Sequence, residues 1–233
     1  GQALAASTEV QARRAEALVG IVTGKTPILT VSAQTLLQRM APRSAFASAI
    51  FELVPGARLP VEQLVPGLVR MGYERAPLCE ARGTFSLRGG ILDLFQALGD
   101  PLRVEFFDDE VDSLRSFDPE SQRSLDRLQR ATVYPFSENP LTPQIMARAA
   151  AALGGGEDAQ LLRQGSAPKD AAALVPACYP DAGNIAAWFG AGAVFAFDDP
   201  VAVRAAAAAA LDKHARLMGD ALEREEMPAC MAD

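Results

Sequence analysis

The first candidate for chemistry is Gly24-Lys25-Thr26, which has the form of the end of a phosphate-binding loop. A complete loop places four residues between its first glycine and this Gly-Lys-Thr. It also leaves a strand and opens a helix, whose N-terminal amides hold the phosphates. Here Gly20 leaves only three residues between, and Pro27 and a predicted strand follow. The order of elements is reversed, so we expect no ATP and no other cofactor to bind here.

The other reactive residue types form no recognisable catalytic set. His214 is the only histidine, which excludes a histidine-rich metal site, and the three cysteines lack the paired spacing of zinc ligands. The carboxylates at 108–110 could indicate a cation site, but three consecutive acidic residues at a hairpin tip point in different directions. We therefore expect no catalytic residue and no metal, and this chain is predicted not to be an enzyme.

The composition favours a protein partner over a nucleic acid. The 233 residues are 49% hydrophobic and 22% charged, as in an ordinary globular protein, and carry a net charge of −7. An acidic chain repels DNA, whereas a DNA-binding domain usually presents a basic face. The scattered cysteines fit a reducing cytoplasm, and no segment reaches the roughly 20 apolar residues of a membrane span. We expect a cytoplasmic protein without a membrane contact.

Two parts of the chain show the alternation of helix and strand that is typical of an α/β layer. Caps, breakers and hydrophobic periodicity define their elements. We predict helices at 7–19, 33–40, 141–153 and 200–225 and short buried strands at 28–31 and 193–197.

The middle of the chain is different, because it is rich in strands. A helix opened by Pro60 is predicted at 60–71, and the connections after it are short, which implies antiparallel neighbours. The strands are predicted at 73–78, 84–88, 91–96, 102–107 and 111–117, followed by a partly helical stretch at 124–130 and a strand at 131–134.

We therefore predict an α/β protein with a small antiparallel α+β domain inserted at 49–121. The first α/β piece covers 1–48 and continues at 122–137, and the second α/β piece covers 138–233. The inserted domain has the more informative sequence, and its strands carry the candidate binding residues.

The strand at 102–107 alternates between apolar and other side chains. Successive side chains of a strand point to opposite faces. Arg103, Glu105 and Phe107 should therefore lie on the outer face, and the core side is formed by Leu102, Val104 and Phe106. Aromatic residues and arginine are enriched in protein interfaces. In the alternative interpretation, Phe107 is buried by the helix at 60–71 and Arg103 merely pairs with Glu105.

Three runs in the middle of the chain resemble a known family. They are RGTFSLRGGILDLF at 82–95, RVEFFDDE at 103–110 and SFDPESQRS at 116–124. These runs are similar to bacterial transcription-repair coupling factors and to their relative, the excinuclease protein UvrB. The residues at 118–124 have the form found in the coupling factors, whereas Thr84 is closer to UvrB. The resemblance is dense from about 60 to 138 and weaker elsewhere.

The resemblance implies a function for the inserted domain. In the coupling factors it binds the excinuclease protein UvrA, and the binding surface falls on Arg88, Arg103 and Phe107 of this sequence. The flanking pieces would be degenerate helicase-like, parallel-sheet α/β relics without a nucleotide site. The chain would then be the non-catalytic adaptor that recruits UvrA to stalled transcription complexes in nucleotide excision repair.

The resemblance also implies that the parent protein is longer. It would be an ATP-dependent DNA translocase that meets RNA polymerase and double-stranded DNA through domains absent from this chain. The alternative is a fragment of UvrB or of another ATP-dependent DNA repair enzyme. That alternative requires a working phosphate-binding loop and an aromatic hairpin that clamps DNA, and the sequence contains neither.

Overall fold

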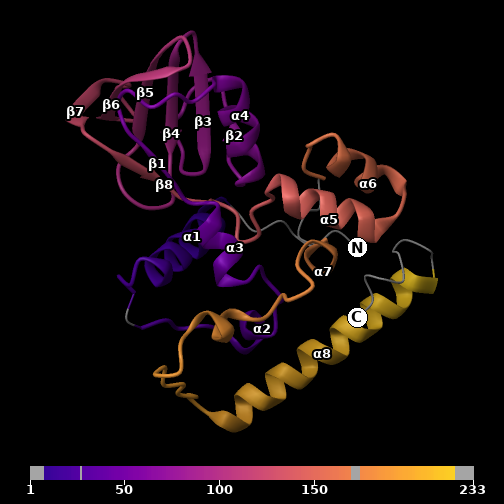
Figure 1. Ribbon diagram of the computed structural model, residues 1–233. Coiled ribbons are helices and arrows are strands. Elements are labelled where there is room, and N and C mark those ends of the chain that lie inside the picture. The colour runs from indigo at the N-terminus through magenta and orange to yellow at the C-terminus, as the bar shows by residue number, and fades with distance from the viewer. Residues whose placement is uncertain (1–7, 27, 169–173, 224–233) are drawn as a thin grey trace. The chain divides into compact units, whose positions relative to one another are not determined.

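The computed structural model describes residues 8–26, 28–168 and 174–223 (Figure 1). The chain divides into two compact units, which we describe separately. One unit comprises residues 1–27 and 44–142, and the other comprises residues 28–43 and 143–233. None of the described helices is long and apolar enough to cross a membrane.

The first unit is built on a six-stranded sheet, in which every neighbouring pair is antiparallel except the parallel pair β2 and β3. Its strands follow the order of the sequence: β2 (Glu74–Arg75), β3 (Thr84–Arg88), β4 (Ile91–Phe95), β5 (Leu102–Phe107), β6 (Glu110–Phe117) and β7 (Ser124–Leu128). A separate antiparallel pair is formed by β1 (Phe51–Leu53) and β8 (Ala131–Val133). The helices of this unit are α1 (Thr8–Val22), α3 (Arg43–Ser48) and α4 (Val61–Arg70).

Turn residues set the hairpins that place β3, β4, β5 and β6 side by side. Gly89 has a φ of 60° in the turn between β3 and β4, and a Cβ atom on Gly90 would lie 2.8 Å from the carbonyl oxygen of Phe106. Asp108 has a φ of 51° at the tip between β5 and β6. Glycine, asparagine and aspartate tolerate this left-handed region better than other residues. The short connections therefore produce the antiparallel pairing predicted from the sequence.

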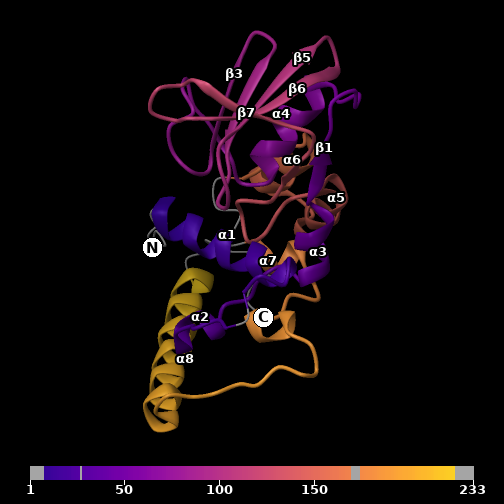
Figure 2. The ribbon, with the colours of Figure 1, turned by 90° about the vertical axis from the view of Figure 1, so that its left-hand side faces the viewer.

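The core lies between one face of the sheet and α4 (Figure 2). Leu64 and Leu68 are four residues apart, so they lie on one side of α4, and both are buried. They join the buried residues of the strands, among them Phe85, Val104 and Leu114. Burial of one such leucine contributes about 1.5–3 kcal/mol. The opposite face of the sheet is left to the polar residues described below.

The second unit is helical in the residues that the structure describes. Its elements are α2 (Ala33–Leu36), α5 (Pro143–Leu153), α6 (Gly156–Arg163), α7 (Val175–Cys178), the 3₁₀ helix η1 (Ile185–Trp188) and α8 (Pro200–Glu223). Trp188 anchors part of this unit, because its indole nitrogen donates to the carbonyl oxygen of Ala41 at 3.0 Å.

The mixed α/β class is confirmed, together with a sheet domain that is antiparallel but for one strand pair. Three element predictions are wrong. Residues 28–31 and 193–197 form no strand, because no described segment pairs with them. Ile28 is 81% exposed and Val194 93% exposed. The stretch at 124–130 is not partly helical, since β7 pairs with β6 there. The parallel sheet expected of the flanking pieces is therefore not formed by these segments.

Candidate protein-binding face

The outer face of the sheet, opposite the core, carries polar residues in two rows across the strands. Directly opposed residues of antiparallel strands point to the same face. The register therefore aligns a first row of Ser86, Asp93, Arg103, Arg115 and Arg127. A second row, one pleat further along, consists of Arg88, Ile91, Glu105 and Ser113.

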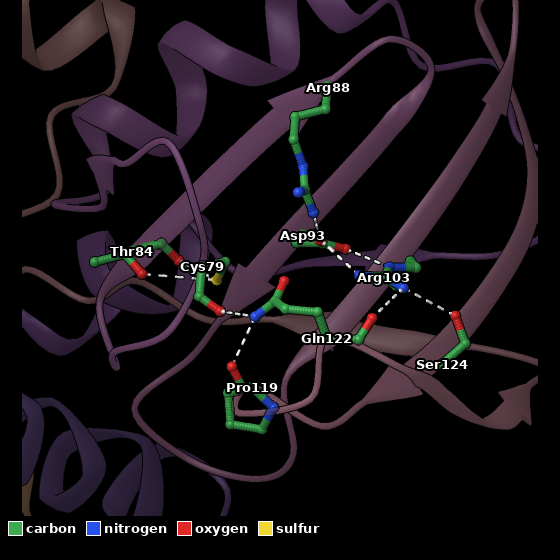
Figure 3. A network of polar contacts seen from close by, with 8 residues as sticks. All are labelled: Cys79, Thr84, Arg88, Asp93, Arg103, Pro119, Gln122 and Ser124. Carbon is green, nitrogen blue, oxygen red and sulfur yellow. Dashed lines mark hydrogen bonds and ion pairs between the residues drawn. The ribbon is translucent and has the colours of Figure 1, made fainter.

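Asp93 is the centre of the first row and is completely buried. Arg103 grips it with two hydrogen bonds, from Nε to Oδ1 at 2.7 Å and from Nη2 to Oδ2 at 2.9 Å (Figure 3). Arg88 adds a third, from Nη2 to Oδ2 at 3.1 Å. Burying a carboxylate costs free energy unless the group is paired and hydrogen-bonded. Bidentate contacts with a carboxylate are among the strongest pairs that arginine forms. The three side chains thus form one charged cluster.

Arg103 is also held from its other side. Its Nη1 donates to the carbonyl oxygen of Gln122 and to Oγ of Ser124, both at 3.1 Å, and its guanidinium lies 4.9 Å from the ring centre of Phe117. The hydrogen bond to Asp93 raises the pKa of Arg103 against the lowering effect of burial. Arg103 is therefore charged and fixed between β4 and the segment that follows β6.

The segment 118–124 covers Arg103 because of its own turn. The carboxylate of Asp118 accepts from the backbone nitrogen and Oγ of Ser121 at 2.7 and 2.6 Å, and these bonds lower its pKa. Gln122 has a φ of 60°, and its Nε2 donates to the carbonyl oxygens of Pro119 and Cys79 (Figure 3). The polar residues of the run at 118–124 thus build a turn over the sheet.

The three predicted binding residues differ in how far their side chains are exposed to solvent. Phe107 faces solvent and is 74% exposed, as predicted, and the side chain of Arg88 is half exposed. Arg103 points to the predicted face but is only 9% exposed, so its expected exposure is wrong. The reason is the covering turn, which strand alternation cannot reveal. Arg88 and Arg103 are brought together by Asp93, whereas Phe107 stands outside this network.

The alternative interpretation of these residues is also wrong. Phe107 is not buried by a helix, and Arg103 pairs with Asp93 rather than with Glu105, whose Oε2 accepts from Oγ of Ser113 at 2.6 Å.

Ile91 was not predicted as part of the surface, although it is a hydrophobic residue that is 38% exposed on the same face. It lies between Arg88 and Glu105 in the second row, across the tight turn from Arg88. Strand alternation was the signal that could have found it, because Leu92 and Leu94 face the core. The exposed part of the face thus has an apolar component near its arginines.

The first row ends in consecutive arginines. Arg103, Arg115 and Arg127 are cross-strand neighbours from β5 to the edge strand β7. Arg115 is partly exposed and Arg127 exposed, and neither side chain forms a hydrogen bond or ion pair with any residue that the structure describes. Like charges placed opposite each other destabilise a strand pair. This row therefore suits a partner that brings negative charge.

The two sites rejected on sequence grounds have ordinary structural surroundings. Lys25 follows the end of α1, and the next helix, α2, starts only at Ala33, so no helix opens directly after Gly24-Lys25-Thr26 as a phosphate-binding loop requires; the strand predicted after it does not form. At the hairpin tip, Asp109 lies 3.8 Å from the guanidinium of Arg58. Among the described residues no group of His, Cys, Asp or Glu side chains is arranged to hold a metal ion. The absence of cofactor and metal stays a prediction.

Comparison with known proteins agrees with this description of the sheet. Residues 51–138, which include the whole six-stranded sheet, match the family model of the UvrB interaction domain. The transcription-repair-coupling factor of Bacillus subtilis (strain 168) is 34% identical over 157 residues, which are 67% of this chain and 13% of the relative. That of Myxococcus xanthus is 39% identical over 127 residues, or 54% of this chain and 11% of the relative.

The transcription-repair-coupling factor of Staphylococcus aureus (strain MRSA252) is 34% identical over 140 residues, or 60% of this chain. The chain spans only 11–13% of the length of these relatives. Their names place them in DNA repair coupled to transcription, and the matched domain is a non-catalytic interaction module. The chain is thus a relative of the transcription-repair-coupling factors, and its residues 51–138 belong to the UvrB interaction domain family.

Proposed function

We propose that this chain is an adaptor that recruits the excinuclease protein UvrA to stalled transcription complexes in nucleotide excision repair. The outer face of the sheet is the binding surface, and Phe107 and Arg88 are its main contacts. The observation that carries the proposal is the 74% exposure of Phe107 on a strand face that also presents arginines, within a UvrB interaction domain. A large aromatic side chain gains most from leaving water when a partner covers it.

The face combines two kinds of interaction. Phe107 and Ile91 supply apolar surface, and Arg88 keeps donors free for the partner, because one of its five N–H groups is used by Asp93. Arginine can bind a partner's carboxylate with two hydrogen bonds. Arg103 contributes as part of the cluster with Asp93, since four of its five N–H groups are hydrogen-bonded inside the protein.

The remaining activities belong to the parent protein in this proposal. Contacts with RNA polymerase and double-stranded DNA, and ATP-dependent translocation, would reside in domains outside this chain. The chain itself would link the repair machinery to that motor by protein contact alone.

The direct test is the affinity of the chain for purified UvrA, measured by isothermal titration calorimetry. Phe107→Ala and Arg88→Ala should each weaken binding by about 2 kcal/mol or more, roughly thirtyfold, as is usual for central contacts. Phe195→Ala is a matched control, because Phe195 is 56% exposed in the other unit. Arg75→Ala, on the exposed edge strand β2, is the control for charge. Full-strength binding by both Phe107→Ala and Arg88→Ala would contradict the proposal.

A further inference from the structure

We infer that Asp93 is a positioning residue of the binding face, which holds Arg88 in the orientation that meets the partner. This inference rests on the proposed function, and it assigns a role in binding to a side chain that no partner can touch. Asp93 is completely buried, whereas the Arg88 side chain is half exposed. The contact between them connects the interior of the domain with its surface (Figure 3).

The acceptor pattern of Asp93 separates its two roles. Arg103 binds the carboxylate bidentately, with one hydrogen bond to each oxygen. The bond from Arg88 at 3.1 Å is an additional contact on Oδ2. Pairing with Arg103 accounts for the burial of the carboxylate. The additional contact restrains a surface side chain, and this restraint is the part that bears on binding.

A restrained arginine binds at lower entropic cost than a free one. An exposed arginine samples many rotamers, and fixing them at an interface opposes association. In this chain the guanidinium of Arg88 is already attached at Nη2 to an acceptor on the neighbouring strand β4. Its other N–H groups remain available for a partner's carboxylate.

Asp93 can act in this way because it is itself immobilised. Arg103, which grips it, is held by the carbonyl oxygen of Gln122 and by Ser124, and it stacks on Phe117. The turn at 118–124 thus helps to restrain the exposed Arg88, because it holds Arg103, and Arg103 in turn holds Asp93. In this view the polar run at 118–124 supports binding without contributing a contact.

A competing effect of Asp93 would have the opposite sign. The carboxylate of Asp93 could compete with the partner's carboxylates for Arg88, and its removal would then strengthen binding. Positioning instead requires that removal weakens binding, and that it does so only while Arg88 is present. A double-mutant cycle distinguishes these effects, since it isolates the coupling between two side chains.

The experiment measures the affinity for UvrA of wild type, Asp93→Asn, Arg88→Ala and the double variant. Asp93→Asn should weaken binding about tenfold, but less than about twofold in the Arg88→Ala background. Asp112→Asn, an exposed aspartate on β6, is the matched control and should bind as wild type. An equal loss in both backgrounds, or wild-type or tighter binding by Asp93→Asn, overturns the inference.

Two further measurements cover the other outcomes. If Asp93→Asn does not fold, Asp93→Asn/Arg103→Gln removes the same anchor without leaving a buried charge, and the cycle is repeated on it. Normal binding by Arg88→Ala alone overturns the inference about Asp93. If wild type does not bind UvrA, or both Phe107→Ala and Arg88→Ala bind at full strength, the proposed function fails. Rotation of the Arg88 guanidinium, measured by NMR on wild type, then decides. Rotation slower than that of the exposed Arg127 supports positioning, and equal rotation overturns it.

Discussion

Replacement of Arg103 by alanine should damage the fold rather than only the binding surface. The substitution removes two of the three hydrogen bonds to Asp93 and leaves that carboxylate completely buried beside the single contact from Arg88. Removing one partner of a buried ion pair typically costs about 3–5 kcal/mol, because the remaining charge is uncompensated. The turn at 118–124 also loses its two hydrogen bonds to the guanidinium. We therefore expect a loss at the upper end of that range.

Urea and thermal unfolding followed by circular dichroism measure this loss. A domain of about 60–100 residues shifts its Tm by roughly 4–8 °C per kcal/mol, so Arg103→Ala should melt at least about 12 °C lower. Arg88→Ala should cost only about 1 kcal/mol or less, because its pair is half exposed. Asp93→Leu/Arg103→Met should recover most of the stability, since no charge stays buried. Arg103→Ala stability within about 1 kcal/mol of wild type would refute the reasoning.

Four other outcomes can be checked. Phe106→Ala should lower the free energy of unfolding by about 2–4 kcal/mol, because Phe106 packs against the core. Phe107→Ala should change it by less than about 1 kcal/mol, because Phe107 is exposed. Equal losses in urea titrations would show that the two side chains do not face opposite sides of the sheet. Arg127→Glu should slow association with UvrA several-fold at low salt, and an unchanged rate in stopped-flow mixing would contradict the role of the arginine row. Burial raises the pKa of the Cys79 thiol to about 11, so only about 0.1% of it is thiolate at pH 8. Mass spectrometry should find Cys79 alkylated in urea but not in the native chain. Rapid alkylation of Cys79 in the native chain would contradict this prediction. Calorimetry should detect no magnesium-dependent ATP binding, and micromolar binding that Lys25→Ala abolishes would overturn this expectation.

The local pattern of the sequence determined the sheet and the direction of its side chains. Tight turns and period-two alternation act between near neighbours, so they predicted the antiparallel strands and the outward direction of Phe107. The same pattern contained the signal for Ile91, whose exposure was overlooked. The residues that form the candidate surface were therefore readable from the chain, apart from how much of each side chain meets water.

Tertiary structure decided which side chains are covered and which segments pair, because the alternation of side chains along a strand carries no information on either. Arg103 lies on the predicted face, yet the turn at 118–124 covers it and turns an expected contact into a buried ion pair with Asp93. Residues 28–31 and 193–197 have the apolar character of strands but remain unpaired in the described structure. Hydrogen-bonded ladders and buried ion pairs need partners from distant positions, and a single segment does not specify where those partners lie.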